Sequence, residues 1–364
     1  MKIKYTQCIR LDEVTTRLYQ EGDDEEIVAL LRSAFDLWAV LPNPLEVWKW
    51  KYRQSPLETH IIVSTVGEEV VGAGHCIKLN VKLGNRVLTS FYDDDYVTKP
   101  EYRKLGVYKA ITNLTDKVKK DASADFCYWI TSNPIILTKT MIHEQVTFPA
   151  PFSDLIRVKN IDQFIEKFSI EETSLLRASY LSKKEATKPI PSPRTDFSII
   201  DVELFDERFE SFWDKISDNY DYFLMRNNDY MNWRFNQNPN LKYKVKAAIS
   251  NGKIIGCVVI EVFNDKGYLD SSIFDLLFHP NRIDVISPLF EEAIHYCDSL
   301  NVDCMSLTTM QDNKYQKIAE SLGFFIAPYA SDVHVRFWGY NEYFYHNICN
   351  LRPEKTYFSY SDYY

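Results

Sequence analysis

One segment combines the residue types that bind phosphate groups. The sequence V-T-K-P-E-Y-R-K-L-G-V-Y at 97–108 stands between an apolar run and an amphipathic run. A glycine at a strand–helix junction lets backbone N–H groups point outward together, and the helix N-terminus adds partial positive charge. The sequence therefore predicts a pyrophosphate site beside Gly106, where Arg103 and Lys104 supply formal charge. An ordinary strand–helix turn with one glycine is the alternative interpretation.

An acidic run precedes this segment. Tyr92 is followed by Asp93, Asp94 and Asp95 on the same predicted strand. Because strand side chains alternate between faces, we expect Asp93 and Asp95 on one face and Asp94 on the other. Adjacent carboxylates repel, and burial of one raises its pKa toward the range of a general base. Asp93 and Asp95 are candidate bases for deprotonating an amine, with a solvated strand edge or a structural aspartate as the alternative.

The elements that must position these residues occur twice in the chain. W-K-Y-R-Q-S-P at 50–56 matches W-R-F-N-Q-N-P at 233–239 in residue type at five positions, with an offset of 183. In both copies a hairpin signal follows, and then an aspartate and a proline five residues apart. We therefore predict two copies of one αβ module. Asp275 repeats Asp95 in a copy that lacks the glycine loop, which leaves Asp93 as the better candidate base.

The predicted fold class is α/β (α+β), with mixed twisted sheets flanked by helices. We expect an N-terminal module at 1–160, a helical and proline-containing linker at 161–198, a degenerate C-terminal module at 199–340 and a tyrosine-rich tail at 341–364. The individual elements follow from hydrophobic periodicity and turn residues. They are strands near 18–19, 60–66, 70–82, 87–98, 126–132 and 304–309, and helices near 24–35, 104–120, 135–143, 161–187, 287–300 and 313–322.

Composition excludes several classes of protein. The formal net charge of −9 argues against a nucleic-acid binder, which would carry a basic face. No apolar run is long enough to cross a membrane, and the N-terminus lacks the apolar stretch of a signal peptide. The seven cysteines are scattered and include no C-x-x-C, so neither a disulfide framework nor a zinc site is expected. We expect a cytoplasmic protein without metal, nucleic-acid or membrane partners.

The order of these motifs resembles the GNAT superfamily of acyl-CoA-dependent N-acyltransferases. A strand, V-x-x-P-x-x-R-x-x-G and a helix are followed by a strand ending near Asn133, and E-Y-R-K-L-G-V-Y is similar to that family's pyrophosphate loop. Tyr108 departs from the pattern, because Gly or Ala is usual there. The resemblance implies that acetyl-CoA is the co-substrate. It also implies that acetyl-CoA binds to the end of the strand near 87–98, to the loop around Gly106 and to the end of the strand near 126–132. The implied residues are Val97, Thr98, Lys99, Arg103, Lys104, Leu105, Gly106, Val107, Tyr108 and Asn133.

The implied function is N-acyltransfer from acetyl-CoA to a small-molecule or peptide amine by direct attack on the thioester. A backbone N–H near Val97 would polarise the thioester carbonyl. The second copy has no glycine at the matching loop, and Asp284 and Pro288 disfavour anion binding there, so one acetyl-CoA per chain is expected. A Fem-type aminoacyl or peptidyl transferase is one alternative. A catalytically inactive CoA- or ligand-binding module of the same fold is another. The sequence identifies neither the amine nor the oligomeric state.

Overall fold

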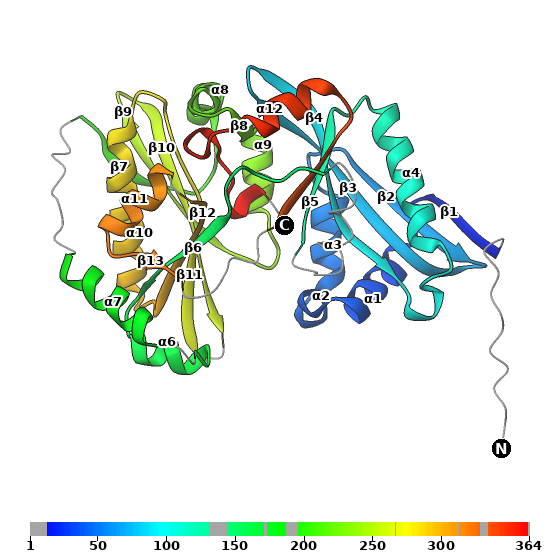
Figure 1. Ribbon diagram of the computed structural model, residues 1–364, viewed down its shortest axis with the longest axis horizontal. Helices are drawn as coiled ribbons and strands as arrows, with labels where there is room; N and C mark the ends of the chain where they lie inside the picture. Colours follow the sequence, from blue (N-terminus) through cyan, green and yellow to red (C-terminus); the bar gives the residue numbers. More distant parts are fainter. Residues whose placement is uncertain are drawn as a thin grey trace.

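The computed structural model describes residues 13–131, 145–170, 173–186, 196–265, 267–311, 313–327 and 334–362. Its strands form two seven-stranded sheets, one in each half of the molecule (Figure 1). Both sheets are mixed and carry helices, so the predicted fold class is confirmed. The helix expected near 135–143, the residue Asn133 and the prolines at 188–194 lie outside the described residues.

The first sheet has the strand order β1-β2-β3-β4-β5-β14, and β8 pairs with β3. Alternate residues of its strands face opposite layers: Ile62 and Val71 pack with α4, whereas Ile61 and Val63 pack with the cluster that includes α1 and α3. The elements of this half are β1 (Val14–Leu18), α1 (Asp24–Ala34), α2 (Asp36–Val40), α3 (Pro44–Tyr52), β2 (Thr59–Val66), β3 (Glu69–Leu83), β4 (Arg86–Thr98), α4 (Val107–Asp121), β5 (Phe126–Ile130), β8 (Tyr222–Leu224), β14 (Val335–Gly339) and α12 (Glu342–Cys349).

The second sheet has the order β13-β6-β12-β11-β10-β9-β7. Its helix α10 packs on β9, β10 and β11, as α4 packs on the first sheet. The remaining elements are β6 (Phe152–Val158), α6 (Ile161–Lys167), α7 (Ser174–Ala186), β7 (Ser198–Val202), α8 (Glu210–Ile216), α9 (Asn228–Met231), β9 (Tyr243–Ser250), β10 (Lys253–Asp265), β11 (Tyr268–Phe278), α10 (Ile286–Ser299), β12 (Cys304–Met310), α11 (Lys314–Ser321) and β13 (Phe325–Ile326).

The two halves exchange strands reciprocally. Strand β6 from the first half of the chain pairs antiparallel with β12 of the second sheet, and β14 pairs antiparallel with β5 of the first sheet. The repeated tryptophans lie at the contact between the halves. Trp50 and Trp233 stack with ring centroids 5.0 Å apart, and each indole N–H donates to the other's carbonyl oxygen at 3.0 Å. This reciprocity is the contact pattern of an isologous dimer within one chain.

Each sheet opens between its two central parallel strands. In the first sheet, β4 and β5 are paired only from Ser90–Phe126 to Tyr92–Tyr128, while β4 continues to Thr98. In the second sheet, β11 and β12 are paired only from Asp270–Cys304 to Ser272–Ser306. We call these openings the first and second splits. They leave backbone groups of β4 and β11 unpaired on the side of the neighbouring strand.

The tail of the chain lies in the second split. The hydroxyl of Tyr357 accepts a hydrogen bond of 3.0 Å from the N–H of Leu276 on β11, and Ser359 contacts Asp275 at 3.3 Å. By the repeat, Leu276 corresponds to Tyr96 at the first split. A pocket lined by residues of β11, β12 and the tail has a volume of about 10 Å³, which is too small for a cofactor. The second split is therefore filled by the protein itself.

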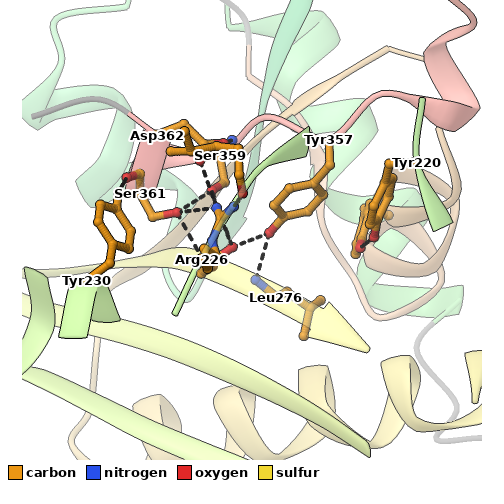
Figure 2. Close-up of polar contacts among 11 residues, drawn as sticks. Tyr220, Arg226, Tyr230, Leu276, Tyr357, Ser359, Ser361 and Asp362 are labelled. Carbon is orange, nitrogen blue, oxygen red and sulfur yellow. Dashed lines mark hydrogen bonds and ion pairs between the residues drawn. The ribbon is translucent and has the colours of Figure 1, made fainter. Parts of the chain in front are cut away.

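A buried ionic cluster holds this tail in place (Figure 2). The guanidinium of Arg226 contacts Asp275 at 2.9 Å and Asp362 at 2.7 Å, and all three side chains are essentially without solvent exposure. Arg226 also donates to the hydroxyl of Ser361 at 2.7 Å. Beyond the cluster, the Tyr128 hydroxyl of β5 donates to the carbonyl oxygen of Asp362 at 3.2 Å. The tail thereby connects the second sheet with the first.

Arg226→Met is expected to destabilise the protein by about 3–5 kcal/mol, because it leaves two buried carboxylates without their cation. Urea unfolding followed by tryptophan fluorescence measures this loss. Arg208→Met is the matched control, since Arg208 pairs with Asp206 at the surface and its loss is expected to cost about 1 kcal/mol or less. Equal stabilities of the two variants would contradict the structural role of the cluster.

Candidate active site

The loop between β4 and α4 presents a row of unpaired backbone donors. Lys104 and Gly106 have φ values of +66° and +86°, so the chain turns sharply before α4 begins at Val107. Among the described residues, the N–H groups of 104–109 have no hydrogen-bond acceptor, and the first bond of this turn runs from Ala110 to the Gly106 carbonyl. No side chain caps the helix. Unpaired donors at a helix N-terminus fit an anionic group such as a pyrophosphate.

This turn also corrects the expected start of the helix. The amphipathic pattern predicted a helix from Lys104, but a residue with positive φ cannot continue a right-handed helix. The helix therefore starts three residues later, and Lys104 and Leu105 belong to the loop. Arg103 donates from Nε to the carbonyl oxygen of Thr98 at 3.2 Å, which ties the loop to the end of β4.

The end of β4 directs only part of its backbone toward the first split. The N–H of Lys99 donates to Val71 of β3 at 2.9 Å, and Val97 is paired with Ala73 of the same strand. Because successive residues of a strand direct their polar groups to opposite sides, the backbone of Thr98 faces the first split. Its carbonyl oxygen accepts the bond from Arg103, so of the residues expected near the cofactor arm Thr98 is the one with a backbone N–H available to it.

Two of the expected cofactor residues have other side-chain contacts. The ammonium of Lys99 is ion-paired with Glu69, and the Tyr102 hydroxyl donates to the same carboxylate at 2.9 Å. Tyr108 is 59% exposed on the first turn of α4, with its ring 6.1 Å from that of Tyr96. Its side chain therefore borders the loop. Val107 is buried against the sheet and contributes its backbone only.

The acidic run does not alternate as expected. A β-bulge interrupts the pairing of β3 and β4 between Ala73 and His75, and Asp95 has a φ of +48°. A bulge adds one residue to a strand and so shifts the side chains that follow it. As a result Asp94 and Asp95 both point toward α3, and Asp93 points toward α4. The expectation that Asp93 and Asp95 share a face was wrong for this reason.

Asp93 lies in a buried ion pair with Lys119 of α4. The Lys119 ammonium contacts Oδ2 of Asp93 at 2.5 Å, and the side chains are 2% and 16% exposed. The other carboxylate oxygen, Oδ1, is buried and has no hydrogen-bond partner among the described residues. Burial raises the pKa of Asp93, although the charge of Lys119 opposes that effect. Asp93 thus has one oxygen fixed and one free to accept a proton.

Asp95 is surrounded by donors. Its Oδ2 accepts hydrogen bonds from the Tyr52 hydroxyl at 2.5 Å and from the Trp38 indole at 3.0 Å. Burial alone would raise the pKa of Asp95, but Lys51 and these hydrogen bonds hold it below its usual value. A carboxylate stabilised in this way is a weak base. Its geometry fits a structural role, as the repeated Asp275 indicated from the sequence.

The sequence interpretation missed a polar cluster on α3. Lys51 contacts Asp94 at 2.5 Å, and the Tyr52 ring stacks on His75 at 4.0 Å. Burial and the neighbouring Asp95 carboxylate raise the pKa of Asp94. Burial lowers the pKa of His75 to about 4, so this imidazole is neutral near pH 7. The tryptophan-rich motif around Lys51 could have indicated the cluster, but it was used only to detect the repeat.

Within the described part of the chain, no group of three or more His, Cys, Asp or Glu side chains could hold a metal ion. No helix in that part is both long enough and apolar enough to cross a membrane. The cysteines described there are free thiols, and all except Cys349 are buried.

The comparisons with known proteins agree with this architecture. Residues 15–137 match the family described as acetyltransferase (GNAT) domain. No curated protein matches the sequence significantly.

Solved structures extend the likeness to the second half. Over 90% of this chain, the fold is similar to that of a protein of unknown function from Enterococcus faecalis described as a probable N-acyltransferase, with a TM-score of 0.63, 10% identity and 72% of that chain covered. It is equally similar to a GCN5-related N-acetyltransferase from Anabaena variabilis, with a TM-score of 0.62, 10% identity and 73% of that chain covered. At such identities the likeness shows the fold alone.

Proposed function

We propose that the protein is an N-acyltransferase that transfers an acetyl group from acetyl-CoA to an amine by direct attack. The observation that carries this proposal is the position of the first split, directly beside the unpaired N–H groups of 104–109. An extended chain could pair with the unpaired stretch of β4 in the way that a ligand adds a strand to a sheet edge, and the helix N-terminus supplies donors for a pyrophosphate. Residues 103–108 would hold the phosphates, and the backbone N–H of Thr98 would pair with the arm. Asn133 is proposed to contact the arm as well.

Acyl transfer by direct attack requires few catalytic side chains. The amine nitrogen forms a bond to the thioester carbonyl carbon, the bond to sulfur breaks, and CoA leaves as a thiolate that takes up a proton from solvent. The amine must also lose a proton, and Asp93 is the proposed acceptor because its Oδ1 is unpartnered and its pKa is raised. A backbone N–H at the bulged end of β4 would stabilise the charge that develops on the carbonyl oxygen.

The acceptor is proposed to be a small-molecule or peptide amine and the setting the cytoplasm, where free thiols persist. Release of CoA thiol in the presence of acetyl-CoA and a panel of small amines, amino sugars and peptides tests the proposal. Amine-dependent release supports it. Acetyl-CoA binding without turnover of any amine would instead favour an inactive binding module of the same fold.

Calorimetric titration is expected to give one acetyl-CoA per chain. The second split is filled by Tyr357 and Ser359, and Pro288 lacks the N–H that a cradle at α10 would need. A stoichiometry of two equivalent sites would contradict both the proposed loop and the role of the tail. If the Gly106→Glu variant also binds one acetyl-CoA per chain with unchanged affinity, the cofactor must bind at another place.

A further inference from the structure

The place where a hairpin turn meets the end of the following strand differs in charge between the two sheets: it lies at the β2–β3 turn and the end of β4 in the first sheet, and at the β9–β10 turn and the end of β11 in the second. In the first half, the turn between β2 and β3 and the end of β4 are joined by Glu69, which binds both Lys99 and the hydroxyl of Tyr102. The repeat aligns these residues with Lys253, His279 and Arg282, because G-E-E-V-V-G at 67–72 matches N-G-K-I-I-G at 251–256 and D-Y-V-T-K-P matches D-L-L-F-H-P. Glu69, the acidic residue in the first half, is thus replaced by Lys253 in the second half.

A pocket is present where this charge has changed. Its volume is about 500 Å³, and Lys253, His279 and Arg282 all line it. Lys215 of α8 adds another positive charge, and no aspartate or glutamate is among the lining residues. Ile254 and Ile255 supply an apolar wall at the start of β10. In the first half, by contrast, the ion pair between Glu69 and Lys99 spans the same place.

The two lysines carry the charge that a ligand would meet. Arg282 is already neutralised, since it contacts Asp284 at 2.9 Å and Asp196 at 3.0 Å. Neither Lys215 nor Lys253 forms a hydrogen bond or ion pair within the described residues. Unpaired ammonium groups that line a concave surface attract small anions.

We propose that this pocket binds a small phosphorylated molecule, with its phosphate at Lys215 and Lys253 and its less polar part against Ile254 and Ile255. The site is separate from the loop proposed for acetyl-CoA, because it lies in the other half of the chain and on residues of β10, α8 and the segment after β11. The proposal does not depend on the transferase activity.

Calorimetric titration with inorganic pyrophosphate, and then with AMP, tests the site in the full-length protein. The titrations use the Gly106→Glu background, so that phosphate binding at the α4 loop does not contribute. We expect binding of each probe to one site per chain. Lys215→Glu combined with Lys253→Glu is expected to weaken it by roughly tenfold or more, since two attractive contacts become repulsive.

Lys242→Glu combined with Lys317→Glu is the matched control, because both residues are exposed and neither lines the pocket. This control is expected to retain binding within roughly twofold. Equal losses in the two double variants would show a general charge effect and overturn the proposal. Absence of binding in the Gly106→Glu background, or binding that survives Lys215→Glu with Lys253→Glu, would also overturn it. None of these outcomes alters the case for the acyltransferase.

Discussion

Gly106→Glu is expected to weaken acetyl-CoA binding by roughly 100-fold or more, because juxtaposed like charges cost several kcal/mol. Gly106 is the last residue before α4, and its φ of +86° lets the N–H groups of 104–109 face outward together. A side chain at this position occupies the space that a pyrophosphate approaches, and its carboxylate repels the phosphates. Calorimetry on the folded variant measures the loss.

Backbone strain must be separated from loss of the site. A residue other than glycine with positive φ costs about 1–2 kcal/mol. Gly67→Glu is the matched control, because Gly67 also has a positive φ of +60°, lies in a surface turn of the same half and has open space where a Cβ atom would lie. It is expected to share the strain and keep acetyl-CoA binding. Normal affinity in Gly106→Glu would refute the loop assignment.

The sequence predicted those features that local residue patterns determine. The glycine-containing turn between β4 and α4 and the two copies of the module both follow from short-range spacing of residue types. The exact start of α4 did not, because the hydrophobic period continues through Lys104 while its φ of +66° interrupts the helix. Periodicity reports which face is apolar and is insensitive to a single residue in the left-handed region.

Features that depend on distant contacts could not be predicted. The bulge at Asp95 is stabilised by Trp38 and Tyr52, which lie more than 40 residues away in the chain. The residue pattern of β6 and β14 indicates a strand whichever sheet it joins, so the sequence does not show that β6 pairs with β12 and β14 with β5. The tail fills the second split through Arg226, a residue that no motif singles out. In each case the decisive contact has a large sequence separation.

Asp93→Asn is expected to lower kcat by roughly 10²–10⁴-fold, the usual contribution of a general base, while the affinity for acetyl-CoA stays unchanged. Asparagine keeps the shape of the side chain but cannot take a proton from the amine. A base works only when deprotonated, so wild-type activity should fall as the pH drops through the pKa of Asp93, which burial raises. The acidic limb of the pH–rate profile should be absent from Asp93→Asn.

The ion pair with Lys119 provides the control that separates catalysis from folding. Asp93→Asn leaves the buried Lys119 ammonium without its counter-charge, which costs about 3–5 kcal/mol of stability. Lys119→Met added to Asp93→Asn removes that charge and should restore much of the stability lost. If Asp93 is the base, turnover stays low in the double variant although the fold recovers. If turnover recovers together with stability, Asp93 serves only to hold α4 on the sheet, and the proton must leave the amine by another route.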